Sequence, residues 1–236
     1  MNKDEFIKNC EYLNIVINDN ILDKFEQYYT LLFEWNQKFN LTAITKKEDV
    51  YLLHFYDSLC LLKAIDLNKY NSLCDFGTGA GFPGIVLALI NNKINIALVE
   101  SNNKKCMFLN EVINKLYLKN VVVINSRMED FSKNSIEKFD IVTCRAVTSI
   151  PIILELSACS IKIGGLLAPL KSNCDEELKK YSYLEKELGL ELEKKIDYKL
   201  PIINANRTIP IYKKINKTDG KYPRNYNIIL KNYKKK

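Results

Sequence analysis

The sequence predicts an α/β protein in which a helical segment precedes a doubly wound, mostly parallel sheet. Apolar residues recur at helical spacings through residues 1–70, a short apolar strand then runs into a glycine-rich loop, and strands alternate with helices from there on. Such alternation is typical of a sheet with helices on both faces. We therefore expect an N-terminal helical cap over residues 1–70 and a second unit over residues 71–236 that ends in a basic tail, the two packed as one compact body.

The cap is expected to contain at least two long helices. A stripe of apolar residues at alternating spacings of four and three marks the first, at Ile21, Phe25, Tyr28, Leu32, Trp35 and Phe39. Thr45-Lys-Lys-Glu48 has the form of a capping box and predicts a second helix from there to about Ala64. On that helix His54, Asp57 and Ser58 share one face. A lone histidine in such a place is more often structural than catalytic.

The glycine-rich loop is the strongest local signal. An apolar strand at 73–76 contains Asp75 and is followed by Gly77, Gly79 and Gly81, and a helix is predicted from Pro83. Glycines let a ligand approach the backbone closely, and a helix N-terminus offers unpaired N–H groups. The next strand ends in Glu100, 23 positions after Gly77, near the spacing at which an acid meets a ribose hydroxyl pair. The pattern predicts a nucleoside cofactor.

The choice of nucleoside follows from what the loop lacks. A dinucleotide-binding fingerprint needs a small residue where Phe82 stands, which disfavours NAD. The loop also has no Gly-Lys-Ser/Thr ending to hold the phosphates of a nucleoside triphosphate such as ATP or GTP. S-adenosylmethionine carries no phosphate and suits a short glycine loop that makes room for its methionine part. We therefore predict S-adenosylmethionine as the cofactor, with a purely structural glycine turn as the alternative.

The remaining elements place further residues at the same edge of the sheet. Strands are expected near 73–76, 94–99, 121–125, 139–144, 165–170, 191–198 and 208–214, with helices at Pro83–Ile90, Lys104–Leu116, Pro151–Ser160 and Asp175–Leu188. Ligands bind outside the carboxyl ends of parallel strands. Ser126–Glu129 and Thr143–Arg145 follow the third and fourth strands, so we expect them at the cofactor edge.

Composition narrows the class of protein. The chain has 236 residues, 47% of them hydrophobic, which is enough for an ordinary core. It begins without an apolar signal core and has no run near the roughly 18 apolar residues of a membrane helix, so we expect a cytoplasmic protein that does not enter a membrane. Its seven cysteines include no Cys-x-x-Cys pair and are expected to be reduced and buried, with no metal site.

The positive charge is concentrated at the C-terminal end. Residues 213–236 hold nine Lys/Arg and one Asp, whereas residues 1–212 hold 26 Lys/Arg and 27 Asp/Glu. Tyrosines alternate with the lysines, and aromatic side chains stack on unpaired bases. The tail is either a solvated end or an arm that contacts RNA phosphates, and we favour the second.

Six segments together resemble one known family. They are Phe39-Asn-Leu-Thr-Ala-Ile44, His54-Phe-Tyr-Asp-Ser-Leu59, Asp75-Phe-Gly-Thr-Gly-Ala-Gly-Phe-Pro-Gly84, Ser126-Arg-Met-Glu-Asp-Phe131, Thr143-Cys-Arg-Ala146 and Lys221-Tyr-Pro-Arg224. In this order they resemble the RsmG (GidB) family of bacterial 16S ribosomal RNA guanine-N7 methyltransferases. The resemblance implies a Rossmann-like, seven-stranded, S-adenosylmethionine-dependent methyltransferase fold with a late antiparallel pair of strands. It thins after Arg224.

The resemblance also implies roles for individual residues. Cofactor contacts are expected at Gly77, Phe82, Met128, Glu129 and Arg145, beside Asp75, Gly79 and Glu100 from the loop itself. RNA contacts are expected at Lys221, Arg224 and, on the cap, His54. The alternative for Glu129 and Arg145, less favoured even without the resemblance, is a surface ion pair.

The expected reaction needs no catalytic side chain, since guanine N7 carries a free lone pair and loses no proton before attack. We therefore expect the protein to act on 16S rRNA or the small ribosomal subunit by orientation and electrostatics, and we expect it to be a monomer. Cys144 raises one rival, methylation of cytosine C5 through a cysteine nucleophile, but it lacks the adjacent proline of those enzymes, and a packed cysteine is favoured. Methylation of another RNA base, a small molecule or a protein remains open, as does an RNA-binding protein without a cofactor.

Overall fold

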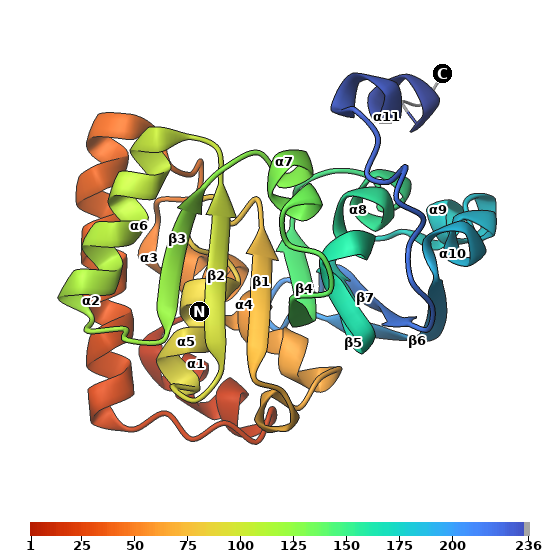
Figure 1. Cartoon of the computed structure of the whole chain (residues 1–236). Helices are drawn as coiled ribbons and strands as arrows, with labels where there is room; N and C mark the ends of the chain where they lie inside the picture. The colour runs from red at the N-terminus through yellow and green to blue at the C-terminus, as the bar shows by residue number, and fades with distance from the viewer. Residues whose placement is uncertain (234–236) are drawn as a thin grey trace.

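The computed structural model describes residues 1–233 and has a seven-stranded sheet at its centre (Figure 1). The strand order is β3-β2-β1-β4-β5-β7-β6, with β7 antiparallel to both of its neighbours and the other pairs parallel. The strands are β1 (Ser72–Phe76), β2 (Asn95–Glu100), β3 (Val121–Asn125), β4 (Phe139–Arg145), β5 (Ile161–Leu170), β6 (Leu190–Lys199) and β7 (Asn206–Lys214). All seven predicted strands are present, and the late antiparallel pair is confirmed.

Helices and helical turns fill the connections. The cap contains α1 (Lys3–Glu11), α2 (Asp19–Phe39), α3 (Lys47–Val50), the π-helical η1 (Tyr51–Tyr56), α4 (Asp57–Leu59) and the 3₁₀ turns η2 (Cys60–Lys63) and η3 (Leu67–Lys69). The sheet carries α5 (Gly84–Ile90), α6 (Asn103–Lys115), α7 (Met128–Lys133), α8 (Ile150–Ser157), η4 (Ala158–Ser160), α9 (Asp175–Lys180), α10 (Tyr183–Leu188) and α11 (Tyr226–Tyr233). Each predicted helix of the sheet is present, although the one expected over residues 175–188 is interrupted at Tyr181 and Ser182.

The alternation of side chains along the central strands explains the two layers of helices. In β1, Leu73 belongs to the core shared with the cap, α5 and α6, whereas Cys74 belongs to the core shared with α7, α8, α10 and α11. The same alternation places Ile141 of β4 toward the cap and Val142 toward α8. Successive side chains of a strand point to opposite faces, so both faces are buried. Arg145, four positions after Ile141, therefore lies on the cap side of the sheet.

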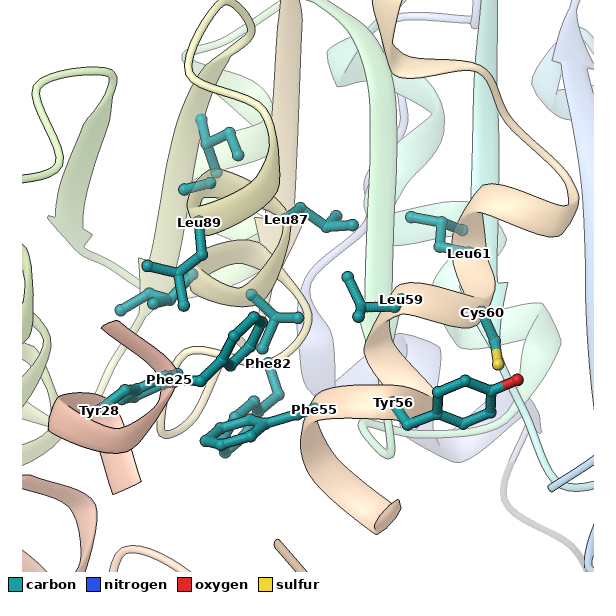
Figure 2. Packing of buried hydrophobic residues seen from close by; sticks show 14 of the residues in the cluster. Phe25, Tyr28, Phe55, Tyr56, Leu59, Cys60, Leu61, Phe82, Leu87 and Leu89 are labelled. Carbon is teal, nitrogen blue, oxygen red and sulfur yellow. The ribbon is translucent and has the colours of Figure 1, made fainter. Parts of the chain in front are cut away.

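Aromatic packing joins the cap to the glycine-rich loop (Figure 2). Phe25 and Tyr28 of α2 pack on Phe55 of η1 with ring centroids 4.9 and 5.4 Å apart. Tyr28 also packs on Phe82, at the end of the glycine loop, with ring centroids 5.5 Å apart. Aromatic pairs at such separations contribute about 0.5–1.5 kcal/mol beyond the area they bury. The predicted stripe on α2 is therefore core packing that holds the loop in place.

One expectation about the cap and one alternative for the tail are wrong. The second cap helix begins at Lys47 after Lys46, which makes no side-chain capping bond, so the capping box at Thr45 does not form. The alternative of a solvated end is wrong for part of the tail, since α11 packs on α8 and buries Ile229 and Tyr233, whereas the contact with RNA phosphates stays a prediction. The interpretation of the tail from its charge did not take into account the apolar residues spaced through this short helix.

Three further findings concern residues 1–233. None of their helices is both long and apolar enough to cross a membrane. All seven cysteines are free and buried, as expected. No cluster of three or more His, Cys, Asp or Glu side chains in this part of the chain has a geometry that could hold a metal ion.

Candidate active site

The glycine-rich loop turns sharply at the carboxyl end of β1. Gly77 and Gly79 have φ of +62° and +61°, a conformation that side chains with a Cβ rarely adopt. The N–H groups of Gly77 and Thr78 both donate to the carbonyl of Val99 in β2, at 2.9 and 3.2 Å. A Cβ on Gly77 would lie 2.9 Å from Val147 Cγ2, in the loop that follows β4. Gly77 is therefore favoured both by the turn and by this close approach, and Gly79 by the turn alone.

Asp75 lies beneath the loop and is fully buried. Its Oδ2 accepts hydrogen bonds from Thr78 Oγ1 at 2.6 Å and from the Gly84 N–H at 2.8 Å, which ties both ends of the loop together. Its Oδ1 is buried and has no hydrogen-bond partner. Burial raises the pKa of Asp75 to about 7, and the bonds from Thr78 and Gly84 only partly offset that rise. An acceptor oxygen without a donor at this edge suits a ligand that carries an ammonium group.

Glu100 ends β2 and reaches the same loop from the neighbouring strand. Its Oε2 accepts from the Gly79 N–H at 3.0 Å and its Oε1 accepts from the Asn102 N–H at 2.8 Å. The residue is 8% exposed. Each carboxylate oxygen has a second lone pair, so Glu100 retains the capacity to accept from two hydroxyl groups. The structure thus brings Asp75, the glycines and Glu100 together, as the sequence predicted.

Phe82 and Arg145 connect this edge to the cap. The ring of Phe82 stacks on His54 with centroids 4.3 Å apart, and the guanidinium carbon of Arg145 lies 5.0 Å from the Phe82 centroid. Tyr28 donates its hydroxyl proton to the Ala80 carbonyl at 2.5 Å. The last part of the glycine loop is therefore held by the cap on one side and by the end of β4 on the other.

Arg145 is partly buried, with 12% of its side chain exposed, and makes its polar contacts with the cap. Its Nη1 donates to the Leu53 carbonyl at 2.6 Å, and its Nη2 donates to His54 Nδ1 at 2.8 Å. The carboxylate of Asp57 lies 3.7 Å from Nη1. Burial lowers the pKa of Arg145, which the nearby Asp57 and Asp75 oppose. The interpretation of Arg145 and Glu129 as an ion pair is wrong, because the carboxylate beside Arg145 is that of Asp57.

The contacts of His54 fix its protonation state. A guanidinium has only donors, so His54 Nδ1 accepts from Arg145, and the ring proton is on Nε2, which lies 2.9 Å from Thr42 Oγ1. Burial, and then the charge of Arg145, lower the pKa of His54 to about 3. His54 is therefore a neutral imidazole that links Thr42, in the Asn-Leu-Thr segment, to the end of β4.

Sequence reasoning missed the residues that complete this network. Asp57 accepts from the Tyr198 hydroxyl at 3.0 Å and from Arg207 Nε at 3.1 Å. Asp57 could have been inferred, since it shares a helix face with His54. Tyr198 and Arg207 lie on β6 and β7, roughly 140–150 positions further along the chain, and carry no local signal.

Met128 and Glu129 begin α7, directly after the carboxyl end of β3. Met128 Sδ lies 3.8 Å from the place a Cβ on Gly77 would occupy, so this helix start borders the glycine loop. Both side chains are partly exposed. The structure therefore places these two predicted cofactor residues at the expected edge.

Lys221 and Arg224 lie elsewhere. With Glu137, Cys159 and Lys214 they line a groove of about 790 Å³ near the amino ends of β4 and β5, which is the edge away from the glycine loop. Arg224 is already engaged, since its Nε and Nη2 donate to the buried Glu155 at 2.8 and 2.6 Å. The structure does not bring these two predicted RNA residues together with His54.

Cys144 is 2% exposed and packs on the α8 side of the sheet, with its thiol pKa raised to about 12 by burial. A nucleophilic cysteine needs a thiolate. This environment therefore argues against methylation of cytosine C5 with Cys144 as the nucleophile.

A Rossmann-like sheet of this order, with a glycine loop and an acidic residue at the ends of its first two strands, defines a methyltransferase that depends on S-adenosylmethionine. Solved structures agree in fold. A SAM-dependent methyltransferase from Aquifex aeolicus has a TM-score of 0.52 at 18% identity, covering 75% of this chain and 97% of that one. M. jannaschii TYW2 in complex with AdoMet has a TM-score of 0.52 at 17% identity, covering 62% and 70%.

Sequence relatives identify the family. The family model described as rRNA small subunit methyltransferase G (GidB) matches residues 21–209. Proteins named ribosomal RNA small subunit methyltransferase G are 43% identical in Lachnoclostridium phytofermentans, covering 93% of this chain and 92% of the relative, and 39% identical in Bacillus subtilis strain 168, covering 95% of each. The chain belongs to the rRNA small subunit methyltransferase G family.

Proposed function

We propose that this protein transfers the methyl group of S-adenosylmethionine to N7 of a guanine in 16S ribosomal RNA. The observation that supports this most directly is that the glycine loop, Glu100 and Arg145 lie together at one edge of the sheet. All three lie within residues 21–209, which match the family model described as rRNA small subunit methyltransferase G. The cofactor would bind at that edge.

The residues of this edge fit the parts of the cofactor. Asp75 Oδ1, buried and without a donor, would accept from the ammonium group directly or through a water molecule. Glu100 would accept from the two ribose hydroxyls. Gly77 and Gly79 would admit the methionine part, whose sulfonium group supplies the methyl. Phe82, Met128, Glu129 and Arg145 would form the remaining walls.

The protein's part in the reaction would be orientation and charge. Guanine N7 presents a lone pair without losing a proton, so no side chain has to act as a base. His54, the single histidine of the sequence, is neutral and has both ring nitrogens engaged by Arg145 and Thr42. We therefore assign His54 to positioning Arg145 and Phe82, and we propose that it borders the RNA rather than moving a proton.

The partner would be 16S rRNA, alone or within the small subunit, and the protein would act in the cytoplasm as a monomer. Lys221 is exposed and remains a candidate phosphate contact. Arg224 would contact RNA only through the part of its guanidinium that Glu155 and Tyr233 leave free, because these residues hold it in place. Both would act on RNA at a distance from the reacting base.

The test is methyl transfer in vitro, with labelled S-adenosylmethionine and purified small subunits or 16S rRNA, followed by digestion to nucleosides. The label should appear in 7-methylguanosine. Label in 5-methylcytidine or in protein, with none in 7-methylguanosine, would refute the proposal and favour the alternative of another substrate.

A further inference from the structure

A cavity of about 350 Å³ lies between the cap, the carboxyl ends of β4 and β5, and the amino end of β7. Leu53, His54 and Asp57 line it from the cap, and Arg145, Leu170 and Arg207 line it from the sheet. Arg145 also holds Phe82 at the end of the glycine loop, with its guanidinium 5.0 Å from the ring centroid. The cavity is thus next to the proposed cofactor edge and separated from it only by side chains of the site.

The size and walls of the cavity suit a single nucleobase. Ligand pockets typically measure about 300–1,000 Å³, so this one is at the small end of the range. Leu53 and Leu170 supply apolar surface, and Asp57, Arg145 and Arg207 supply polar groups. A purine has apolar faces and polar edges, and enzymes that modify a base take it out of the stack into such a pocket.

Arg207 lines this cavity with a guanidinium whose Nη2 has no acceptor within residues 1–233. Its Nε donates to Asp57 Oδ2 at 3.1 Å and its Nη1 donates to the Asn206 carbonyl at 3.0 Å, while its Nη2 has no acceptor there. The side chain is 20% exposed. An arginine anchored at its base with one amino group free is pre-organised to donate to a phosphate oxygen.

We propose that this cavity receives the target guanosine, with the base between Leu53 and Leu170 and Arg207 Nη2 donating to the phosphate of that nucleotide. The inference rests on the proposed function, since it names where the substrate of that reaction binds. In this position the guanine would contact Arg145, which would also contact the cofactor.

Filling the cavity from its rim tests the base site. Ser172 is exposed and lines the cavity, so Ser172→Trp would occupy it without disturbing the core. We expect kcat/KM for 16S rRNA or small subunits to fall at least about tenfold, which corresponds to about 1.4 kcal/mol, and Kd for S-adenosylhomocysteine to stay unchanged. The matched control is Ser182→Trp, an exposed serine at the start of α10 that does not line the cavity, which should behave as wild type.

Arg207→Gln tests the phosphate contact. Losing one contact to single-stranded RNA should make the slope of log affinity against log salt less negative by about 0.7. Tyr198→Phe is the control for an indirect effect, because it removes a different bond to Asp57 and leaves Arg207 in place. It should leave the salt slope unchanged.

Full activity of Ser172→Trp on the RNA substrate would overturn the base site. A salt slope for Arg207→Gln equal to that of wild type, or an equal change in Tyr198→Phe, would overturn the phosphate contact and reduce Arg207 to a link between cap and sheet. Absence of 7-methylguanosine from the wild-type reaction would instead refute the proposed function, so the two failures are distinguishable.

Discussion

Replacing Asp75 by Asn should remove a pH dependence of cofactor binding that the wild-type protein has. Burial raises the pKa of Asp75 to about 7, so the carboxyl of the cofactor-free protein is largely protonated in mildly acidic solution. A bound ammonium group favours the ionised form, which lowers this pKa. Binding therefore releases a proton, and affinity should rise with pH.

The magnitude follows from linkage between ionisation and binding. If the pKa falls from about 7 to well below 5.5, Kd for S-adenosylhomocysteine should decrease about tenfold from about pH 5.5 to about pH 7. Above that range the pKa of Asp75 no longer matters, and the cofactor's own amino group begins to titrate. The pKa of His54, about 3, keeps that residue neutral throughout.

The stability of the cofactor-free protein should fall as pH rises, whereas its affinity for the cofactor rises. The pKa is raised in the folded state, so the contribution of Asp75 to the free energy of unfolding is full below its ordinary value of 3.8 and is lost as pH rises through about 7. At about 1.4 kcal/mol per pKa unit the loss is on the order of 4 kcal/mol. Between these pH values the Tm of wild type should therefore fall by more than the Tm of Asp75→Asn.

Isothermal titration calorimetry across this range, in buffers of different ionisation enthalpy, measures both affinity and proton release. Asp75→Asn should keep the loop bonds, because its amide oxygen can take the place of Oδ2 and accept from both Thr78 Oγ1 and the Gly84 N–H. Its affinity should be weaker and independent of pH. A wild-type affinity that is flat or falls with pH, with no proton released, would refute the role given to Asp75.

Three other predictions concern single features. Glu100→Gln should weaken S-adenosylhomocysteine binding about tenfold to a hundredfold, the effect of losing a charge-assisted hydrogen bond of roughly 1.5–3 kcal/mol, whereas Glu111→Gln on α6 should not; an unchanged Kd would mean that Glu100 does not meet the ribose. Cys144→Ala should remain active and form no covalent adduct with RNA, because the thiol is buried with its pKa at about 12; a trapped adduct in wild type that this variant loses would move the reaction to cytosine C5. Lys221→Ala with Lys231→Ala should flatten the salt slope of RNA binding by about 1.4 if both lysines contact phosphates, with cofactor affinity unchanged; a slope equal to that of wild type would show that they are only solvated.

That last experiment uses substitutions because truncation would damage the fold. Tyr233 is 6% exposed, packs edge-on against Tyr181 and accepts a hydrogen bond from Arg224 at 2.8 Å. Cutting after Leu230 would remove this contact together with the charge. Lys234, Lys235 and Lys236, which carry part of the predicted positive arm, lie outside the described residues.

The sequence was most informative where function depends on consecutive residues. The loop from Asp75 to Gly84 and the end of β2 at Glu100 could be predicted because glycines, a strand end and a helix start follow one another in the chain. Residues at strand ends, such as Met128 and Arg145, followed from the rule that parallel strands meet at one edge.

Contacts between distant segments could not be predicted in this way. The partners of Arg145 are His54 and Asp57 on the cap, about 90 positions earlier, and Arg207 joins them from β7. Arg224 looked like a free cation in the sequence, yet the carboxylate that neutralises it is Glu155, 69 positions away on α8. Charge counted along the chain does not reveal which charges are already paired.

The most direct test of the central claim is the mapping of 7-methylguanosine in 16S rRNA from cells with and without this protein. We predict one guanine that is methylated at N7 when the protein is present and unmodified when it is absent, with methylation restored by wild type and not by Asp75→Asn with Glu100→Gln. An identical pattern of N7 methylation in both kinds of cell would contradict the account.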